Sequence, residues 1–121
     1  MFKNNPILKF KGKYYPLIKT GAKTQTMRIP AKRIDNIKEH DFVVATFTDR
    51  PEMLLLEITK VGYKSFGSIT DEDAKREGFM SKAELRHELE TIYTEYVLQD
   101  YNRLYYYQFI LAGELEVVKE Q

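Results

Sequence analysis

The stretch DFVVATFTDRPEMLLLEITKV, residues 41–61, decides the fold because two β-rich runs in it flank one short turn. Residues 41–48 and 53–61 are rich in β-branched, aromatic and aliphatic side chains, which favour strands. The Asp-Arg-Pro segment between them is typical of a turn. In the second run three apolar side chains alternate onto one face: Leu54, Leu56 and Ile58. This pattern predicts an antiparallel pair of strands with one face toward a core.

Further strand patterns lie on both sides of this pair. Residues 7–10 alternate weakly, and residues 24–28 alternate before Pro30 ends the run. The strongest β signal in the chain is LYYYQFIL, residues 104–111, and a last short run follows at 115–118. The chain is therefore expected to form five or six strands.

Helix signals fall in the gaps between these strands. A short helix is expected to begin at Pro16 and to end at Gly21. Thr70 and Asp73 have the spacing of a capping box, which predicts a second short helix that ends at Gly78. Both helices are therefore insertions between strands.

A longer helix is predicted over residues 81–101, beginning at Ser81 with Glu84 three positions later. Its apolar positions recur at helical spacing and should pack on a core: Leu85, Leu89, Ile92 and Tyr96. The pattern favours an α+β fold, a small mostly antiparallel β-barrel with two or three inserted helices, over a parallel βαβ sheet. No linker or repeat divides the sequence, so residues 1–121 are expected to form a single domain.

Composition excludes several classes of function. Nineteen basic and eighteen acidic side chains give a net charge of +1, so no global field draws the protein to nucleic acid or to a membrane. The chain has no cysteine and only two histidines, His40 and His87, which leaves no thiolate zinc site and no cysteine nucleophile. No apolar run could span a membrane and no signal-peptide core follows the first methionine, so a cytoplasmic protein without a membrane partner is expected.

The stretch GAKTQTMR, residues 21–28, is the candidate site. It brings an amine, two hydroxyls and a guanidinium within a few residues of one another, just after the expected end of the first helix. Alternation places Thr24, Thr26 and Arg28 on one face of the strand. A lysine followed by alternating threonines is also common on solvent-facing strands, so the stretch alone does not establish catalysis.

These residues suggest a family. The pattern Gly-x-Lys-Thr-x-Thr-x-Arg at residues 21–28 of a small β-rich chain resembles the signature of the ASCH domains, which have a PUA-like barrel. Within that group the chain is most similar to the small bacterial N4-acetylcytidine amidohydrolases. The likeness extends to an Ala-x-x-Glu segment at residues 74–77, to the amphipathic helix after it and to the aromatic strand at 104–111.

The resemblance implies a site residue by residue. Lys23, Thr26 and Glu77 match the positions of the family's catalytic lysine, threonine and glutamate. The substrate would be bound by other motif positions: Gly21, Thr24 and Arg28. The activity that the resemblance implies is the hydrolysis of N4-acetylcytidine, or of a related acylated nucleoside, to cytidine and acetate.

The chain departs from the family pattern in several places. Ala22 stands where the family has an arginine, and Gln25 and Met27 stand where the motif strand has apolar residues. The chain is also longer, with extra residues around 29–40 and at the C-terminus. These differences bear on the substrate more than on the fold.

The chemistry suits such a trio without a metal ion or a cofactor. Hydrolysis of the acetyl amide needs a nucleophile, support for the oxyanion and a proton for the leaving amine. Lys23, desolvated so that its pKa falls, would activate Thr26 or a water molecule, and Glu77 would hold or carry the proton. Glu77 precedes Gly78 at a helix C-terminus, where the helix dipole raises its proton affinity. Arg28 or backbone amides would bind the oxyanion or the base edge.

Two other functions stay open. An RNA-binding module would use the tyrosines at 105–107 and a short basic patch. That patch comprises Lys32, Arg33 and Lys38. A ribonuclease would use Lys23 and Arg28 to stabilise a pentavalent phosphate. The expected partner is a nucleoside or a modified RNA base, with RNA itself as the alternative, and the expected state is a monomer.

Overall fold

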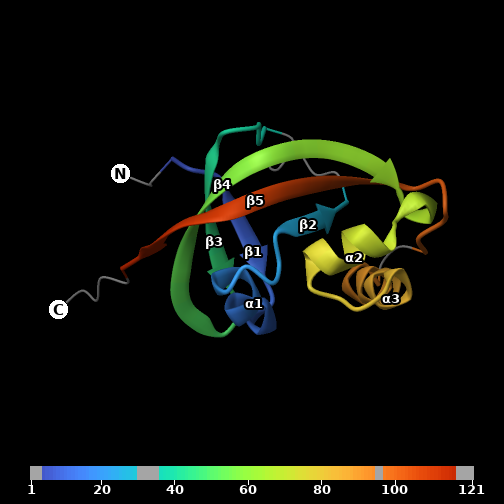
Figure 1. Ribbon diagram of the computed structural model, residues 1–121, viewed down its shortest axis with the longest axis horizontal. Helices are drawn as coiled ribbons and strands as arrows, with labels where there is room; N and C mark the ends of the chain where they lie inside the picture. The colour runs from blue at the N-terminus through green and yellow to red at the C-terminus, as the bar shows by residue number, and fades with distance from the viewer. Residues whose placement is uncertain (1–3, 30–35, 95–96, 117–121) are drawn as a thin grey trace.

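The computed structural model describes residues 4–29, 36–94 and 97–116, and its centre is one curled sheet (Figure 1). The strand order is β1-β3-β4-β5-β2. The strands are β1 (Ile7–Phe10), β2 (Gln25–Arg28), β3 (Phe42–Phe47), β4 (Arg50–Ser65) and β5 (Arg103–Leu115). The helices are α1 (Tyr15–Lys19), α2 (Asp71–Glu77) and α3 (Lys82–Ile92), with 3-10 turns η1 (Gly12–Tyr14) and η2 (Phe66–Ser68).

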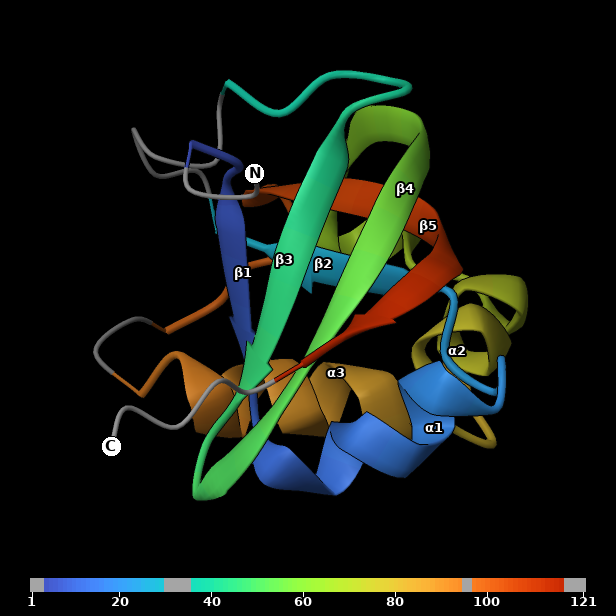
Figure 2. The same cartoon turned by 90° about the vertical axis from the view of Figure 1, so that its left-hand side faces the viewer.

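The sheet is mixed and open. β1 runs parallel to β3, whereas β3–β4, β4–β5 and β5–β2 are antiparallel. β4 and β5 are long, and register shifts between Leu55 and Leu56 and between Ile58 and Lys60 bend the pair. The sheet therefore curls into half a barrel, with α1 and α3 lying beneath one end of it (Figure 2). This arrangement confirms the predicted α+β fold and the predicted antiparallel pair of β3 and β4.

The core has two parts. The first lies inside the curled sheet and includes the alternating face of β4: Leu54, Leu56 and Ile58, each 0% exposed. The second lies between the sheet and the helices and includes Met27, Leu85, Leu89 and Leu104. Each such side chain contributes about 1.5–3 kcal/mol when fully buried. β2 borders both parts, so the candidate residues sit where the two meet.

The long helix is shorter than predicted. α3 ends at Ile92 instead of near residue 101, and Ile92 is 39% exposed instead of packed in the core. Tyr93 leaves the helical region at φ −104° and ψ 59°. Leu98 then packs into the second core, and Asn102 forms a turn with Gln99 through two hydrogen bonds. Tertiary packing of Leu98 outweighs the helical spacing. Tyr96 lies outside the described residues.

The last strand is longer than predicted. β5 runs unbroken from Arg103 to Leu115, through Gly113, because β4 pairs with it along its whole length to Met53. β4 likewise begins earlier, at Arg50, than the predicted run from residue 53. Of the short strand predicted at 115–118, the residues from Val117 onward lie outside the described residues. Pro30, which was predicted to end the strand at 24–28, also lies outside them.

Candidate functional site

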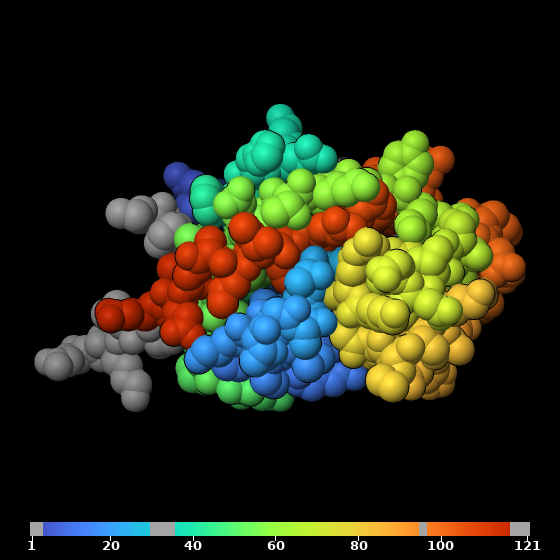
Figure 3. Space-filling model, viewed as in Figure 1, coloured from blue at the N-terminus to red at the C-terminus, as the bar shows by residue number. Residues whose placement is uncertain are grey.

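The segment that carries Lys23 is fixed on three sides. Gly21, at a φ of 83°, ends α1 in the left-handed conformation that glycine adopts without strain. The backbone N–H of Lys23 then donates to Leu17 O at 2.9 Å. Thr24 N–H donates to Arg76 O at the end of α2, and Thr24 O accepts from Phe109 in β5. In the space-filling view this light-blue segment lies directly against α2 and β5 (Figure 3).

Glu77 reaches the same place from α2. The predicted capping box is confirmed, with Thr70 and Asp73 bonded reciprocally at the N-terminus of the helix. Gly78 ends the helix at a φ of 93°. A Cβ atom on Gly78 would lie 3.2 Å from Leu17 Cδ1 and 3.7 Å from Lys23 Cβ. The end of α2 therefore packs directly on the Lys23 segment.

Lys23 and Glu77 form a buried ion pair. Lys23 Nζ lies 3.2 Å from Glu77 Oε1 and donates also to Glu77 O at 3.2 Å. Both side chains are less than 5% exposed. Among the described residues Glu77 Oε2 makes no hydrogen bond of good geometry, although the Gln25 side chain and the Met27 backbone N–H are close enough to lower the pKa of the carboxyl. Burial lowers the pKa of Lys23 and raises that of Glu77, while the attraction between the two charges opposes both shifts.

Thr26 and Arg28 form a second pair next to the first. Arg28 Nε donates to Thr26 Oγ1 at 3.3 Å, and Arg28 Nη2 donates to Lys9 O at 2.8 Å. The guanidinium lies over the ring of Phe10, 4.8 Å from its centroid, and burial lowers its pKa. Among the described residues the hydrogen bond of the Thr26 hydroxyl leads to Arg28 and not to Lys23 or Glu77.

Thr26 and Arg28 open onto a small pocket of about 130 Å³. Its other lining residues come from β1, η1, β2 and the end of α3: Lys9, Phe10, Lys11, Tyr14, Met27, Ile92 and Tyr93. Tyr14 joins this pocket to the ion pair, because Lys23 Nζ lies 4.7 Å from the centroid of its ring. The structure thus brings Lys23 together with Glu77 and Thr26 with Arg28, on either side of Tyr14. Gly21 and Thr24 contribute backbone geometry.

Tyr14 and Glu88 are site neighbours that the sequence analysis did not assign. The Tyr14 hydroxyl donates to Glu88 Oε2, which also accepts from Lys13 at 2.9 Å and from Lys11 at 3.4 Å. Burial alone would raise the pKa of Glu88, but these partners outweigh it and lower the pKa to about 2. Burial and the Glu88 charge raise the pKa of Tyr14. In the sequence Glu88 comes directly before Leu89, a predicted core residue of the long helix. This position is the signal that could have indicated that Glu88 lies near the core.

A buried polar network explains one departure from the family pattern. Gln25, which stands at an apolar motif position, is 0% exposed. Its Nε2 donates to Asp73 Oδ1 at 3.2 Å, and its Oε1 accepts from Gln108 at 3.0 Å. Lys64 Nζ donates to Asp73 Oδ2 at 2.7 Å. The polar groups of Gln25 are therefore paired, which removes most of the cost of burying them.

The structure describes the basic patch only in part, and both histidines. Lys32 and Arg33 are outside the described residues, and Lys38 is exposed. His40 and His87 are both exposed and separate. No group of three or more His, Cys, Asp or Glu side chains within residues 4–29, 36–94 and 97–116 could hold a metal ion. No helix in these ranges is both long and apolar enough to cross a membrane.

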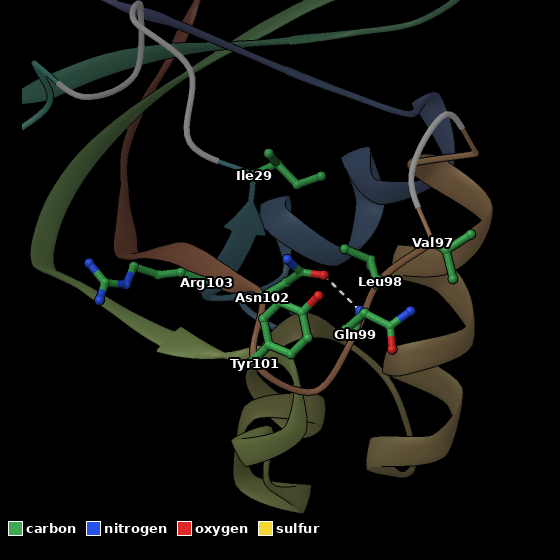
Figure 4. Close-up of a pocket in the computed structure, with 7 residues that line it drawn as sticks. All are labelled: Ile29, Val97, Leu98, Gln99, Tyr101, Asn102 and Arg103. Atoms are coloured by element: carbon green, nitrogen blue, oxygen red, sulfur yellow. Dashed lines mark hydrogen bonds between the residues drawn. The ribbon is translucent and has the colours of Figure 1, made fainter.

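A larger pocket of about 530 Å³ lies beyond the end of β2, between Ile29 and the segment that leads into β5 (Figure 4). Its lining is Ile29, Val97, Leu98, Gln99, Tyr101, Asn102 and Arg103. None of these residues was a sequence candidate. Figure 4 shows the Arg103 side chain pointing away from Val97 and Gln99.

Comparison with known sequences identifies a family. The sequence model of the ASCH domain family matches residues 1–119. A search of the curated protein sequences found no match.

Solved structures share the fold at low sequence identity. The match to the ASCH domain from Lactobacillus crispatus covers 81% of this chain and 69% of the Lactobacillus chain, with 16% identity and a TM-score of 0.68. A protein from Enterococcus faecalis covers 85% of this chain and 69% of its own, with 16% identity and a TM-score of 0.66. The match to a mutant ASCH protein from Zymomonas mobilis covers 93% of this chain and 73% of the Zymomonas chain, with 13% identity and a TM-score of 0.62. Similarity at these identities shows the fold alone.

Proposed function

The chain belongs to the ASCH domain family, and from that premise we propose that it is an amidohydrolase that deacetylates N4-acetylcytidine or a related acylated cytidine. Membership indicates an RNA-binding or hydrolase-like module. The observation that carries the finer proposal is the buried pair of Lys23 and Glu77, in which one carboxylate oxygen makes no hydrogen bond of good geometry among the described residues. A buried polar atom left without a partner costs about 1–3 kcal/mol, so a fold rarely retains one without a function.

Burial provides the acid and the base. It favours transfer of the proton from Lys23 to Glu77, because the neutral pair costs less to desolvate than two charges. A neutral Lys23 amine accepts a proton from a nucleophile, and a protonated Glu77 donates one to a leaving group. One buried pair can thus supply both proton transfers of an amide hydrolysis.

The reaction balances with these groups. Lys23 takes a proton from a water molecule or from the Thr26 hydroxyl, and the freed oxygen attacks the acetyl carbonyl. The bond between the carbonyl carbon and N4 breaks, and N4 takes the proton of Glu77. Attack by water gives acetate and cytidine directly, whereas attack by Thr26 gives an acyl-threonine that water then hydrolyses. The pair, left as ammonium and carboxylate, returns to its neutral form by passing the proton back.

Arg28 supports the developing charge in this proposal. Its guanidinium is largely buried, hydrogen-bonds to Thr26 and has no carboxylate within 4.0 Å among the described residues. Such a donor stabilises an oxyanion more strongly than it stabilises a neutral carbonyl. The pocket of about 130 Å³ is smaller than the roughly 300–1,000 Å³ of pockets that enclose a whole drug-sized ligand. We expect it to hold the acylated base, with the sugar outside.

Turnover of N4-acetylcytidine, followed by chromatography of cytidine and acetate, tests the proposal. Lys23→Met, which keeps the length of the side chain, should lower kcat by about 10²- to 10⁴-fold because it removes the base. Lys19→Met is the matched control, since Lys19 is an exposed lysine paired with Glu114. Circular dichroism should show both variants folded. A folded wild-type protein without turnover, or an active Lys23→Met, would contradict the proposal.

A further inference from the structure

Two arginines of the described residues differ from the others because no carboxylate oxygen lies within 4.0 Å of them. Arg50, Arg76 and Arg86 each have a carboxylate oxygen within 4.0 Å, at 2.9, 3.9 and 2.9 Å. Of the five arginines in the described residues, only Arg28 and Arg103 have no such partner. A cation without a neutralising carboxylate is available for an anionic ligand.

Strand register joins these two arginines through a pair of tyrosines. Arg28 in β2 is opposite Tyr105 in β5, and Tyr105 is opposite Tyr63 in β4, so the three side chains share one face of the sheet. Arg103, two residues before Tyr105, lies on the same face. The rings of Tyr63 and Tyr105 are 6.3 Å apart at 79°, and the Arg103 guanidinium lies 4.3 Å above Tyr63. We call Arg28, Tyr105, Tyr63 and Arg103 the aromatic row.

The aromatic row is exposed at one end and enters the candidate site at the other. Tyr63 is 57% exposed, so its ring is open to solvent at this end of the row. Tyr105 is partly buried, and Arg28 lines the small pocket beside Thr26. Arg103 borders the larger pocket of about 530 Å³. Among the described residues no Asp or Glu lines either pocket, so the charged side chains that line them are all basic.

This combination of groups fits a single-stranded polynucleotide. Exposed tyrosine rings and guanidinium planes stack on unpaired bases, and unpaired guanidinium groups bind phosphates. An acidic peptide would use the charges but not the rings, and an apolar partner would not need the arginines. β2 and β4 are two strand spacings apart, which is about 10 Å. This distance leaves room for a second nucleotide next to the one whose base occupies the small pocket.

We propose that the aromatic row is a subsite for single-stranded RNA, which presents the acylated cytosine to the small pocket while a flanking base stacks on Tyr63 and Arg103 contacts the phosphate. The proposal rests on the proposed function for the reaction, but the RNA contact stands on the aromatic row alone. It makes the preferred substrate a modified base within an RNA strand and not a free nucleoside.

Binding of a short, fluorescein-labelled, unmodified single-stranded RNA, measured by anisotropy at several salt concentrations, tests the contact without any reaction. Tyr63→Ala should weaken affinity about 5- to 150-fold, the range for losing one stacked base, while Tyr63→Phe should retain it. Arg103→Ala should reduce the slope of log affinity against log salt by about 0.7. Arg50→Ala is the matched control for Arg103→Ala, because the Arg50 guanidinium also lies over a tyrosine ring, 4.2 Å from the centroid of Tyr15, but outside the aromatic row. Arg50→Ala should bind like wild type.

Turnover of two substrates completes the test. The same RNA carrying one N4-acetylcytidine should be deacetylated with a higher kcat/KM than the free nucleoside, and Tyr63→Ala should lower only the value for RNA. Wild-type protein that does not bind the RNA, or Tyr63→Ala and Arg103→Ala that bind it as well as wild type, would overturn the subsite. A kcat/KM no higher for the RNA than for the nucleoside would overturn RNA as the preferred substrate. RNA binding that depends on Tyr63 and Arg103, without turnover of either substrate, would support the subsite and contradict the amidohydrolase.

Discussion

Asp73 and Glu77 lie one turn apart on α2 and are equally buried, at 2% and 3% exposure, yet their environments differ in kind. The carboxylate of Asp73 accepts hydrogen bonds from Lys64, Gln25 and Thr70. Burial would raise its pKa, but these bonds outweigh burial and lower it. Glu77 has one cationic partner, Lys23, and weaker polar contacts from the Gln25 side chain and the Met27 backbone N–H, while its Oε2 makes no hydrogen bond of good geometry among the described residues. Burial outweighs these contacts and raises its pKa.

The difference shows that burial alone does not indicate function. A buried acid whose hydrogen bonds outweigh its desolvation holds its charge and stabilises the fold, whereas a buried acid whose contacts do not offset desolvation is poised to take up a proton. By this criterion Asp73 is structural and Glu77 is the proposed catalytic carboxylate.

The largest expected effect separates the two acids by activity. Glu77→Gln should lower kcat for N4-acetylcytidine by about 10²- to 10⁴-fold, because the amide cannot carry the proton. Asp73→Asn, an equivalent change one turn earlier, should leave kcat within an order of magnitude. Steady-state kinetics on both folded variants measures the contrast. Equal losses of kcat would mean that the two acids do not differ as proposed.

The second effect separates them by stability. Asp73→Ala should lower the free energy of unfolding by about 2–4 kcal/mol, since it removes a capping box and leaves Gln25 and the Lys64 ammonium without their acceptor. Glu77→Gln should cost less, because the amide oxygen can still accept from Lys23. Urea denaturation at neutral pH gives both values. A more stable Asp73→Ala than Glu77→Gln would reverse the assignment.

The third effect is the pH dependence of stability. Asp73 has a lowered pKa in the folded protein, so its contribution is present above the unfolded value of about 3.9 and is lost as the pH falls through the folded value. Glu88 behaves in the same way: its contribution to stability is lost as the pH falls from its unfolded pKa of about 4.3 toward its folded pKa of about 2. Denaturation between pH 6 and pH 2 should show a decline that is shallower in Asp73→Asn by about 1–3 kcal/mol in total. An unchanged decline would show that Asp73 does not hold its charge in the fold.

The smallest effect concerns Tyr14, which lies between the two pairs of candidate residues. Tyr14→Phe keeps the ring under Lys23 and removes the hydroxyl bonded to Glu88, while Lys11 and Lys13 still neutralise that carboxylate. The free energy of unfolding should fall by only about 1 kcal/mol, and kcat should stay close to that of wild type. Thermal denaturation and the nucleoside assay measure these. A large loss of kcat would place the Tyr14 hydroxyl itself in the reaction.

Much of the fold could be predicted because it depends on local patterns. The alternation of Leu54, Leu56 and Ile58 predicted the buried face of β4, and Thr70 with Asp73 predicted the start of α2. The end of α3 could not be predicted in this way. Its spacing continues past Ile92, and the packing of Leu98 and the turn at Asn102 end the helix through contacts that are distant in the sequence.

The candidate site divides in the same way. The motif placed Lys23, Thr26 and Arg28 within one short segment, and the Ala-x-x-Glu pattern pointed to Glu77. That Lys23 and Glu77, 54 residues apart, meet at 3.2 Å depends on α2 packing against the segment after α1. Tyr14, Glu88 and the buried partners of Gln25 carry no motif, so no local pattern could have identified them.

The sequence by itself determined the strand and helix types, the capping of α2 and the residue types that the proposed chemistry needs, because periodicity and capping act over a few residues. Only the tertiary structure decided which of these groups are buried, which are fully hydrogen-bonded and which meet. It set the opposite pKa shifts of Asp73 and Glu77 and aligned Arg28, Tyr105 and Tyr63 across three strands. Desolvation and strand register depend on neighbours that are far apart in the chain, and that is the physical reason for the division.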